Sequence, residues 1–201
     1  RHALESGRSL ASPKHPPVTQ TPQALEQARA AYRRALDLAR EARLDGLAID
    51  AIHMFAFVDT SPADQLRWGR EALAVVESSD QPAAKRWEAS IRNNIGYALH
   101  QLGRYDEALD EFARALALRE RGTDAEATRA ARWMVGWTLR SLGRRDEALA
   151  IQLRLERECD AAGAPDEYVY EELVELYKAA GDAGRMRHYE ARLAALRPAA
   201  P

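Results

Sequence analysis

The sequence lacks the features that mark secreted and membrane-spanning proteins. Its 201 residues contain a single cysteine, Cys159, so no disulfide can form within the chain. A reducing compartment is compatible with that composition. No apolar run approaches the roughly 18 residues that a transmembrane helix needs. We therefore expect a cytoplasmic protein with no membrane partner.

An excess of charge of one sign is also absent. The chain carries 29 Lys and Arg against 31 Asp and Glu, which gives a formal net charge of −2. A domain that binds nucleic acid through its phosphates normally shows a basic patch or a strongly basic composition. We therefore expect no nucleic-acid partner. No stretch alternates apolar and polar residues with a period of two, so essentially no β-strand is expected either.

Signatures of catalysis and metal binding are missing too. There is no His-Glu-x-x-His motif, no pair of cysteines and no glycine-rich phosphate loop. His53 and His100 could share one surface, but two histidines without a third ligand make a weak metal site. We expect no catalytic residue, no metal, no cofactor and no enzymatic activity.

What the chain does contain is an internal repeat. The segment from Leu102 to Leu109 returns forty residues later, from Leu142 to Leu149, with seven of eight residues identical. Self-similarity at a fixed period in a helical sequence is typical of a stacked repeat array. Each unit of such an array buries its apolar face against its neighbours, so the repeat predicts architecture and leaves the partner open.

Start and stop signals for helices divide the rest of the chain into about nine helices. Thr21-Pro22 and Ser61-Pro62 place a capping hydroxyl before proline, and Thr123 with Glu126 forms a capping box. Asp45 is expected to cap another helix, and one continuous helix is expected from Pro82 to Gly103. The array should cover residues 21–198, after a disordered or mobile leader over residues 1–20 in which His2–Leu10 forms at most one or two turns. Its expected units are 22–44 (a half repeat), 46–79, 82–122, 124–163 and 165–197.

The repeat resembles the tetratricopeptide repeat, whose units pair two antiparallel helices. Residues 89–122 match its pattern well, and residues 129–162 match until Gln152 and Leu155, where an aromatic residue and an alanine are usual. The resemblance implies an all-α fold, an α-α superhelix in the form of a solenoid of antiparallel helix pairs. The usual period is about 34 residues, so a period of forty implies longer helices or loops, similar to kinesin-light-chain-like arrays.

The resemblance leaves two features of the upstream repeats open. Ala28 and Tyr32 fit a second helix whose first partner is absent or unrecognisable. In a strict forty-residue register Trp68 takes the place of Ala108, a site for a small residue. A competing register for residues 46–80 aligns Ala72 with Ala108 instead.

The resemblance also implies a binding surface, because the inner helices of such arrays line a concave groove. Their groove-facing positions predict a peptide-binding site with no metal and no catalytic residue. The candidate residues are His53, Phe57, Asn93, Tyr97, Trp133, Trp137 and Arg140. The helix expected after Pro165 places Glu171 and Glu175 at the same positions. Its acidic face is either solvated or a groove wall that selects basic residues of a ligand.

Helical geometry gives partial support for the tryptophans. At about 100° per residue, Ala131, Val135, Thr138 and Leu142 form an apolar stripe, and Trp133 lies nearly opposite it. Trp137 is also displaced from the stripe. The alternative is that both tryptophans pack against the neighbouring inner helix.

Three classes of function remain. The first is a scaffold or adaptor that holds a protein or peptide segment in an aromatic groove. The second is a structural module that self-associates into a homo-oligomer through its end repeats. The third is a regulatory domain of a larger protein.

The glycines of the repeat generate the first prediction. Gly103 and Gly143 each end an apolar helical stretch, so each is expected at positive φ or in a tight turn. Replacing either with valine should lower the free energy of unfolding by about 1 kcal/mol or more, because β-branched residues tolerate that conformation poorly. Chemical denaturation of both variants measures the change, and unchanged stability in both contradicts the assignment.

Overall fold

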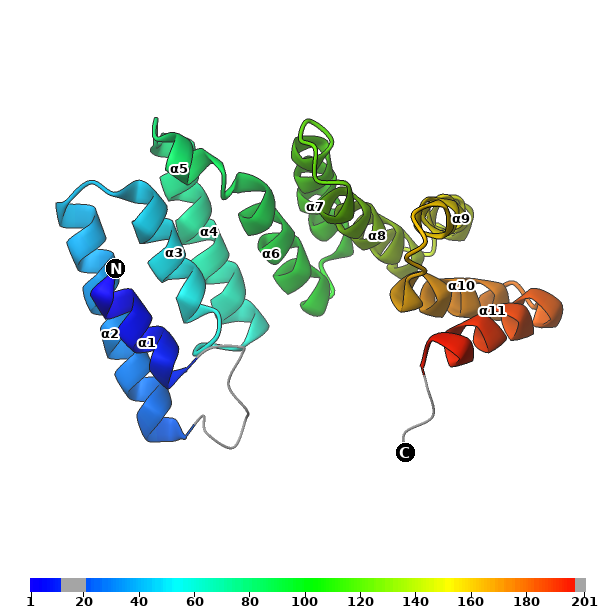
Figure 1. Ribbon diagram of the computed structural model, residues 1–201, viewed down its shortest axis with the longest axis horizontal. Coiled ribbons are helices and arrows are strands. Elements are labelled where there is room, and N and C mark those ends of the chain that lie inside the picture. The colour runs from blue at the N-terminus through cyan, green and yellow to red at the C-terminus, as the bar shows by residue number, and fades with distance from the viewer. Residues whose placement is uncertain (12–20, 198–201) are drawn as a thin grey trace. The chain divides into compact units, whose positions relative to one another are not determined.

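The computed structural model describes residues 1–11 and 21–197, and the regular structure in these ranges is entirely helical (Figure 1). This confirms the all-α prediction. The helices are α1 (His2–Leu10), α2 (Pro22–Glu41), α3 (Asp45–Phe55), α4 (Pro62–Ser78), α5 (Pro82–Lys85), α6 (Glu88–Gln101), α7 (Tyr105–Arg119), α8 (Ala125–Ser141), α9 (Arg145–Ala161), α10 (Glu167–Ala179) and α11 (Ala183–Leu196).

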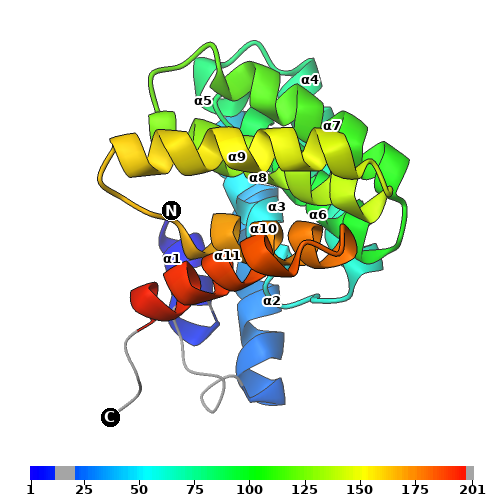
Figure 2. The same ribbon diagram turned by 90° about the vertical axis from the view of Figure 1, so that its right-hand side faces the viewer.

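The chain divides into two compact units, Arg1–Leu118 and Arg119–Pro201. The first unit contains the antiparallel pairs α1/α2 and α3/α4, with α5 as a short turn before α6. Helix α6 pairs with α7 through the contact of Gly96 with Phe112, and α7 ends at Arg119, the first residue of the second unit. The second contains α8/α9 and α10/α11, and α10 packs against both α9 and α11 (Figure 2). A solenoid of antiparallel helix pairs is thus present in each unit.

Within residues 1–11 and 21–197, five helices end in the same backbone turn. In each, a residue at positive φ follows the helix, and the next N–H donates to the carbonyl five residues earlier, as from Arg104 to Leu99 (2.9 Å). The φ values are 73° at Gly103 and 76° at Gly143, so the prediction for both is confirmed. The other three turns centre on Arg43, Gly163 and Gly181.

The helix starts agree with the sequence signals in most places. Thr21 and Ser61 accept hydrogen bonds from Ala24 N (3.2 Å) and Asp64 N (3.1 Å), as predicted. The capping box at Thr123 is wrong by one residue, because Asp124 is the N-cap of α8 and accepts from Ala127 N.

Two further helix boundaries differ from the predictions. Asp45 lies inside α3, whose N-cap is Leu44. The helix expected from Pro82 is interrupted after Lys85, where the Trp87 N–H donates to Ala84 at the three-residue spacing of a tight turn.

Paired helices approach closely where a glycine of the first helix faces a large side chain of the second. A Cβ placed on Gly96 would lie 2.8 Å from the Phe112 ring, and one on Gly7 would lie 2.4 Å from the Tyr32 ring. Helix α1 is therefore the missing first partner of α2, and the prediction of a mobile leader is wrong for residues 2–10. Leu4, Gly7 and Ala11 are buried, which explains why this segment is ordered. Residues 12–20, with their three prolines, lie outside the described residues.

Burial in α4 supports the competing register. Ala72 and Val76 are fully buried, as are Ala108 and Phe112 in α7. Trp68 instead stacks on Phe55 with ring centroids 4.3 Å apart.

One buried position departs from the repeat in chemistry. Gln152 of α9 takes the place that Phe112 has in α7, facing Gly136 of α8. Its side chain is fully buried, and neither its amide nitrogen nor its oxygen has a hydrogen-bond partner within the described residues. An unsatisfied buried amide costs free energy that a nonpolar side chain of the same shape does not.

The turn that ends these five helices yields a prediction at Arg43, where the other four turns have glycine. Arg43 has φ 52° and is exposed. The Arg43→Gly variant should unfold with a free energy higher by about 0.5–1 kcal/mol, since glycine enters the left-handed region without the Cβ penalty. Denaturant titration measures this change. The reverse substitution, Gly103→Arg, is the matched control and should lower stability. Destabilisation by Arg43→Gly would contradict this account of the turn.

The buried amide of Gln152 yields another prediction. Gln152→Met keeps the length of the side chain and removes both unsatisfied groups. It should raise the free energy of unfolding by about 1–2 kcal/mol. Gln101→Met, at an exposed position, should leave stability nearly unchanged. If Gln152→Met is neutral or destabilising in thermal and chemical denaturation, the amide is not the energetic defect that the structure indicates.

Candidate functional site

The predicted site residues lie on first helices of the pairs or directly after them, but in two different units. His53, Phe57, Asn93 and Tyr97 belong to the first unit, and Trp133, Trp137 and Arg140 belong to the second.

His53 is the centre of the group in the first unit. Its ring lies 5.3 Å from the Phe57 ring in an edge-to-face arrangement and 5.6 Å from the Trp87 ring. The Asn94 amide nitrogen lies 3.3 Å from His53 Nδ1. The structure therefore brings His53 and Phe57 together. The contacts of His53 with Trp87 and Asn94 join α3 to α6.

The charge near His53 is balanced by an ion pair. Asp50, one turn before His53, binds Arg8 of α1 at 2.5 Å. Burial lowers the pKa of His53 below its ordinary value, the Asp50 carboxylate opposes that shift and Arg8 adds to it. His53 is therefore a neutral ring at pH 7. It is suited to stacking and hydrogen bonding.

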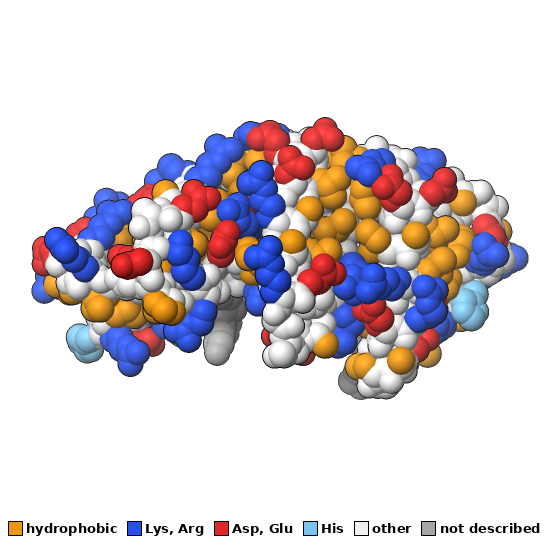
Figure 3. All heavy atoms as spheres, turned by 90° about the horizontal axis from the view of Figure 1, so that it is seen from above, with side chains coloured by type: hydrophobic (Ala, Val, Ile, Leu, Met, Phe, Trp, Pro, Cys, Tyr) orange, Lys and Arg blue, Asp and Glu red, His pale blue; other side chains and the backbone are white. Residues whose placement is uncertain are grey.

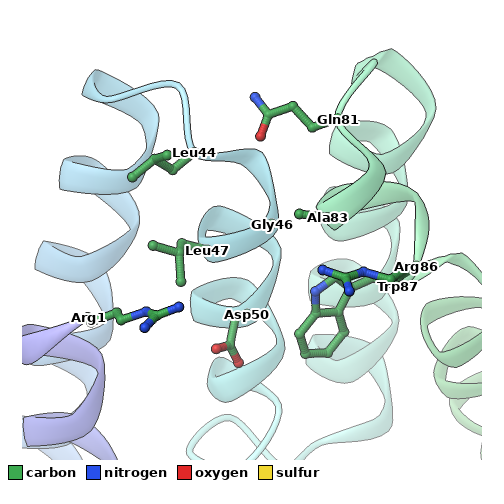
Figure 4. A pocket seen from close by; sticks show the side chains of 9 residues that line it. All are labelled: Arg1, Leu44, Gly46, Leu47, Asp50, Gln81, Ala83, Arg86 and Trp87. Carbon is green, nitrogen blue, oxygen red and sulfur yellow. The ribbon is translucent and has the colours of Figure 1, made fainter.

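A pocket of about 280 Å³ opens beside this group, between α3 and α5 (Figure 4). The side chains of Asp50 and Trp87 approach it from opposite sides, and Leu44 and Leu47 form an apolar wall. Gly46 allows the close approach of α5, because a Cβ there would lie 3.0 Å from the Ala83 side chain. The remaining lining residues are Arg1, Gln81 and Arg86.

Asn93 and Tyr97 occupy the next first helix, α6. Tyr97 is 42% exposed, an unusual degree for a large apolar ring. Asn93 is half-buried, and no hydrogen bond of its amide is found among the described residues. Its donor and acceptor could both serve a bound backbone.

The second unit presents an aromatic cluster, which we define as Trp133, Trp137 and Tyr168. The two indoles stack with centroids 5.6 Å apart and planes 18° apart, and the Tyr168 ring meets Trp133 edge-on at 6.1 Å. Trp133 Nε1 donates to the Tyr168 carbonyl at 3.1 Å. Neither tryptophan is fully buried, and Tyr168 is 57% exposed. The cluster thus packs partly against α10, as the alternative interpretation held, and remains reachable from solvent.

Arg140 of α8 forms an ion pair with Glu172 of α10. Its Nε and Nη2 both donate to the Glu172 carboxylate at 2.7 Å, and Glu172 is buried. These bonds raise the pKa of Arg140 above its ordinary value. This guanidinium joins α8 to α10, and the role of Arg140 at the edge of the groove stays a prediction.

The apolar stripe predicted for α8 is only partly correct. Ala131 and Thr138 are buried as expected, but Val135 and Leu142 are half-buried. Gly136 and Leu139 are buried in their place. Trp133 and Trp137 remain off this buried face.

Sequence reasoning missed two aromatic members of these groups. Tyr168 lies in the first turn of α10, where the Asp166 side chain caps its N–H at 2.9 Å. Trp87 lies at the break between α5 and α6. Neither fits the repeat pattern, although Asp166 as a cap would have placed Tyr168 at the exposed start of a helix.

The part of the chain that the structure describes also bears on other kinds of site. Within residues 1–11 and 21–197, no group of three or more His, Cys, Asp or Glu side chains could hold a metal ion. None of the helices in those ranges is long and apolar enough to span a bilayer. On the face drawn in Figure 3, basic, acidic and apolar side chains are intermixed, and neither charge covers it alone.

Part of the chain matches a known family. Residues 87–156 match the family model described as tetratricopeptide repeat. No curated protein matches the sequence.

Solved structures share the fold at low sequence identity. BtubC from P. vanneervenii is 19% identical, with a TM-score of 0.67 over 100% of this chain and 90% of that one. A putative kinesin light chain with nearly identical TPR-like repeats from Podosopora anserina is 14% identical, with a TM-score of 0.69 over 98% and 93%. YrrB, described as a TPR protein with an unusual peptide-binding site, is 18% identical, with a TM-score of 0.62 over 98% and 86%.

The Arg140–Glu172 pair leads to a prediction about the second unit. Glu172→Gln keeps the shape but leaves the half-buried Arg140 without its charge partner, so unfolding free energy should fall by about 2–4 kcal/mol. Arg104 and Glu107 form an exposed pair of the same two-bond geometry. Glu107→Gln should therefore cost no more than about 0.5 kcal/mol. Equal effects of the two variants in denaturation would show that burial does not distinguish the pairs.

Proposed function

We propose that this chain is a scaffold that binds a peptide or protein segment on the first helices of its pairs, because residues 87–156 match the tetratricopeptide repeat. Arrays of this kind bind partners along an extended surface. The observation that carries the proposal is the aromatic cluster of the second unit. Three contiguous aromatic side chains that remain in contact with water are costly unless a partner covers them.

The chemistry of the cluster suits a peptide. Indole and phenol rings supply apolar contact area with few torsions to freeze on binding. Trp and Tyr are also the residues that most often dominate binding energy at interfaces. The carbonyl of Tyr168 already accepts from Trp133, so the two helices hold the rings in place before a ligand arrives.

The first unit offers a second contact region of the same kind. His53 and Phe57 form its aromatic part, Tyr97 adds an exposed ring, and Asn93 adds an amide for the peptide backbone. A similar fold in YrrB is described with a peptide-binding site, which supports this class of ligand.

Two other functions are retained as alternatives. Self-association through the end repeats would make the chain a structural module, and linkage to further domains would make it a regulatory part of a larger protein. Catalysis is not part of the proposal, and the sole cysteine suits a reducing compartment such as the cytoplasm.

Paired alanine substitutions in the cluster test the proposal. Trp133→Ala should weaken binding of a captured partner by about 1–3 kcal/mol, and Trp133→Ala with Trp137→Ala should abolish capture. Trp133→Ala alone should lower the free energy of unfolding by less than the roughly 3–5 kcal/mol that truncating a buried aromatic side chain costs. The measurement is affinity capture with the wild-type chain as bait, followed by titration of the purified partner.

A core variant controls for lost stability. Val76→Ala truncates a fully buried side chain of the first unit and leaves the aromatic cluster intact. It should keep its partner while losing stability. If the double tryptophan variant retains the partner with unchanged affinity, the cluster is packing only and the proposed site is wrong.

A further inference from the structure

The outer face of the α10/α11 pair is a second surface, separate from the aromatic cluster. It contains a pocket of about 630 Å³. Val174 of α10 and Leu193 and Ala194 of α11 form its apolar floor. The charged residues around them are Arg140, Glu171, Glu172, Glu175, Glu190 and Arg197.

The repeat relates this face to one that already holds a helix. The turn glycines Gly143 and Gly181 align α8 with α10, so Glu171 and Glu175 occupy the positions of Trp133 and Trp137. Trp133 of α8 contacts Tyr168 of α10, so the face of α8 that carries Trp133 packs against the first helix of the next pair. The equivalent face of α10 is covered by no other helix of the second unit among the described residues.

Acidic side chains outnumber basic ones on this face. Glu172 is neutralised by Arg140, and Glu171 pairs with the exposed Arg197. Glu175 lies 3.8 Å from the exposed Lys178, a distance at which a surface pair contributes little. Glu190 has no ion-pair partner among the described residues. Four carboxylates against two guanidinium groups leave the lining of the pocket negative.

We propose that this face docks a basic amphipathic helix of a partner protein. The repeat geometry argues for a helix, because the equivalent face of the α8/α9 pair holds one. The negative rim argues for lysine or arginine on the docking helix, spaced three and four residues apart so that they share one side. Small apolar side chains on the same helix contact Val174 and Leu193. This docking surface goes beyond the proposed function, since the aromatic cluster takes no part in it.

Synthetic helices test the chemistry directly. The probe is a peptide of about 18 residues, or five helical turns, made of Leu, Ala and Lys with all lysines on one side. The control peptide has the same composition with lysines on every side. Isothermal titration of the 201-residue chain should show at least about tenfold tighter binding of the probe than of the control peptide, which corresponds to about 1.4 kcal/mol.

Charge reversal locates the site. Glu171→Lys with Glu175→Lys should abolish binding of the lysine peptide and create binding of the same peptide with Glu in place of Lys. Asp37→Lys with Asp110→Lys changes the net charge equally at two exposed helical positions of the first unit and should leave the preference unchanged. Glu171→Gln with Glu175→Gln provides a milder variant, with a smaller loss in the same direction.

Three results would overturn the proposal. Equal binding of the probe and control peptides would show that lysines along one side of a helix are not recognised. Equal losses in the two charge-reversal variants would show that binding follows net charge alone. Self-association of the wild-type chain that disappears in Glu171→Gln with Glu175→Gln would show that a second copy takes this face. Peptide binding should persist in the Trp133→Ala, Trp137→Ala variant, so failure here and failure of the proposed function are distinguishable.

Discussion

The close approach of two helices at a glycine is the constraint on which the remaining structure depends. Gly96 leaves room for the Phe112 ring, which fills the space that a side chain would take. Close packing of this kind transmits any change in volume to the neighbouring helices. Gly7 with Tyr32 and Gly136 with Gln152 repeat the arrangement, so one local rule builds three of the pairs.

This rule also determines which side chains are left for binding. A first helix that buries its glycine face against its partner keeps its other face for the neighbouring first helix or for a ligand. Trp133 and Trp137 lie on that second face of α8 and contact Tyr168 of α10 without being fully buried. The same positions carry glutamates in α10, so units of one architecture can present an aromatic surface in one place and an acidic surface in another.

The sequence predicted those parts of the fold that depend on local signals. Gly103 and Gly143 predict their turns because glycine is the residue that enters positive φ without strain. The prediction from the sequence failed at α1, because Gly7 and Tyr32 are twenty-five residues apart whereas Gly96 and Phe112 are sixteen apart. The longer connection hides the pair from any search at a fixed period. Arg43 has the same turn without the glycine that would reveal it.

The candidate site was predictable in part for a related reason. Repeat positions identify the first-helix face, and they placed His53 beside Phe57 and Trp133 beside Trp137. They contain no information on which neighbour a long side chain will reach. The pairing of Arg140 with Glu172 and the contact of Tyr168 with Trp133 depend on the packing of α10 against α8, which no local pattern encodes.

The most direct test of the central constraint is a double-mutant cycle between Gly96 and Phe112. Gly96→Ala should destabilise the wild type by about 1–3 kcal/mol through overpacking, despite the better helix propensity of alanine. In a Phe112→Val background the added methyl group has space, so the same change should be neutral or stabilising, with a coupling energy above about 1 kcal/mol. If the two substitutions add within about 0.5 kcal/mol, the glycine does not serve the approach of the paired helices.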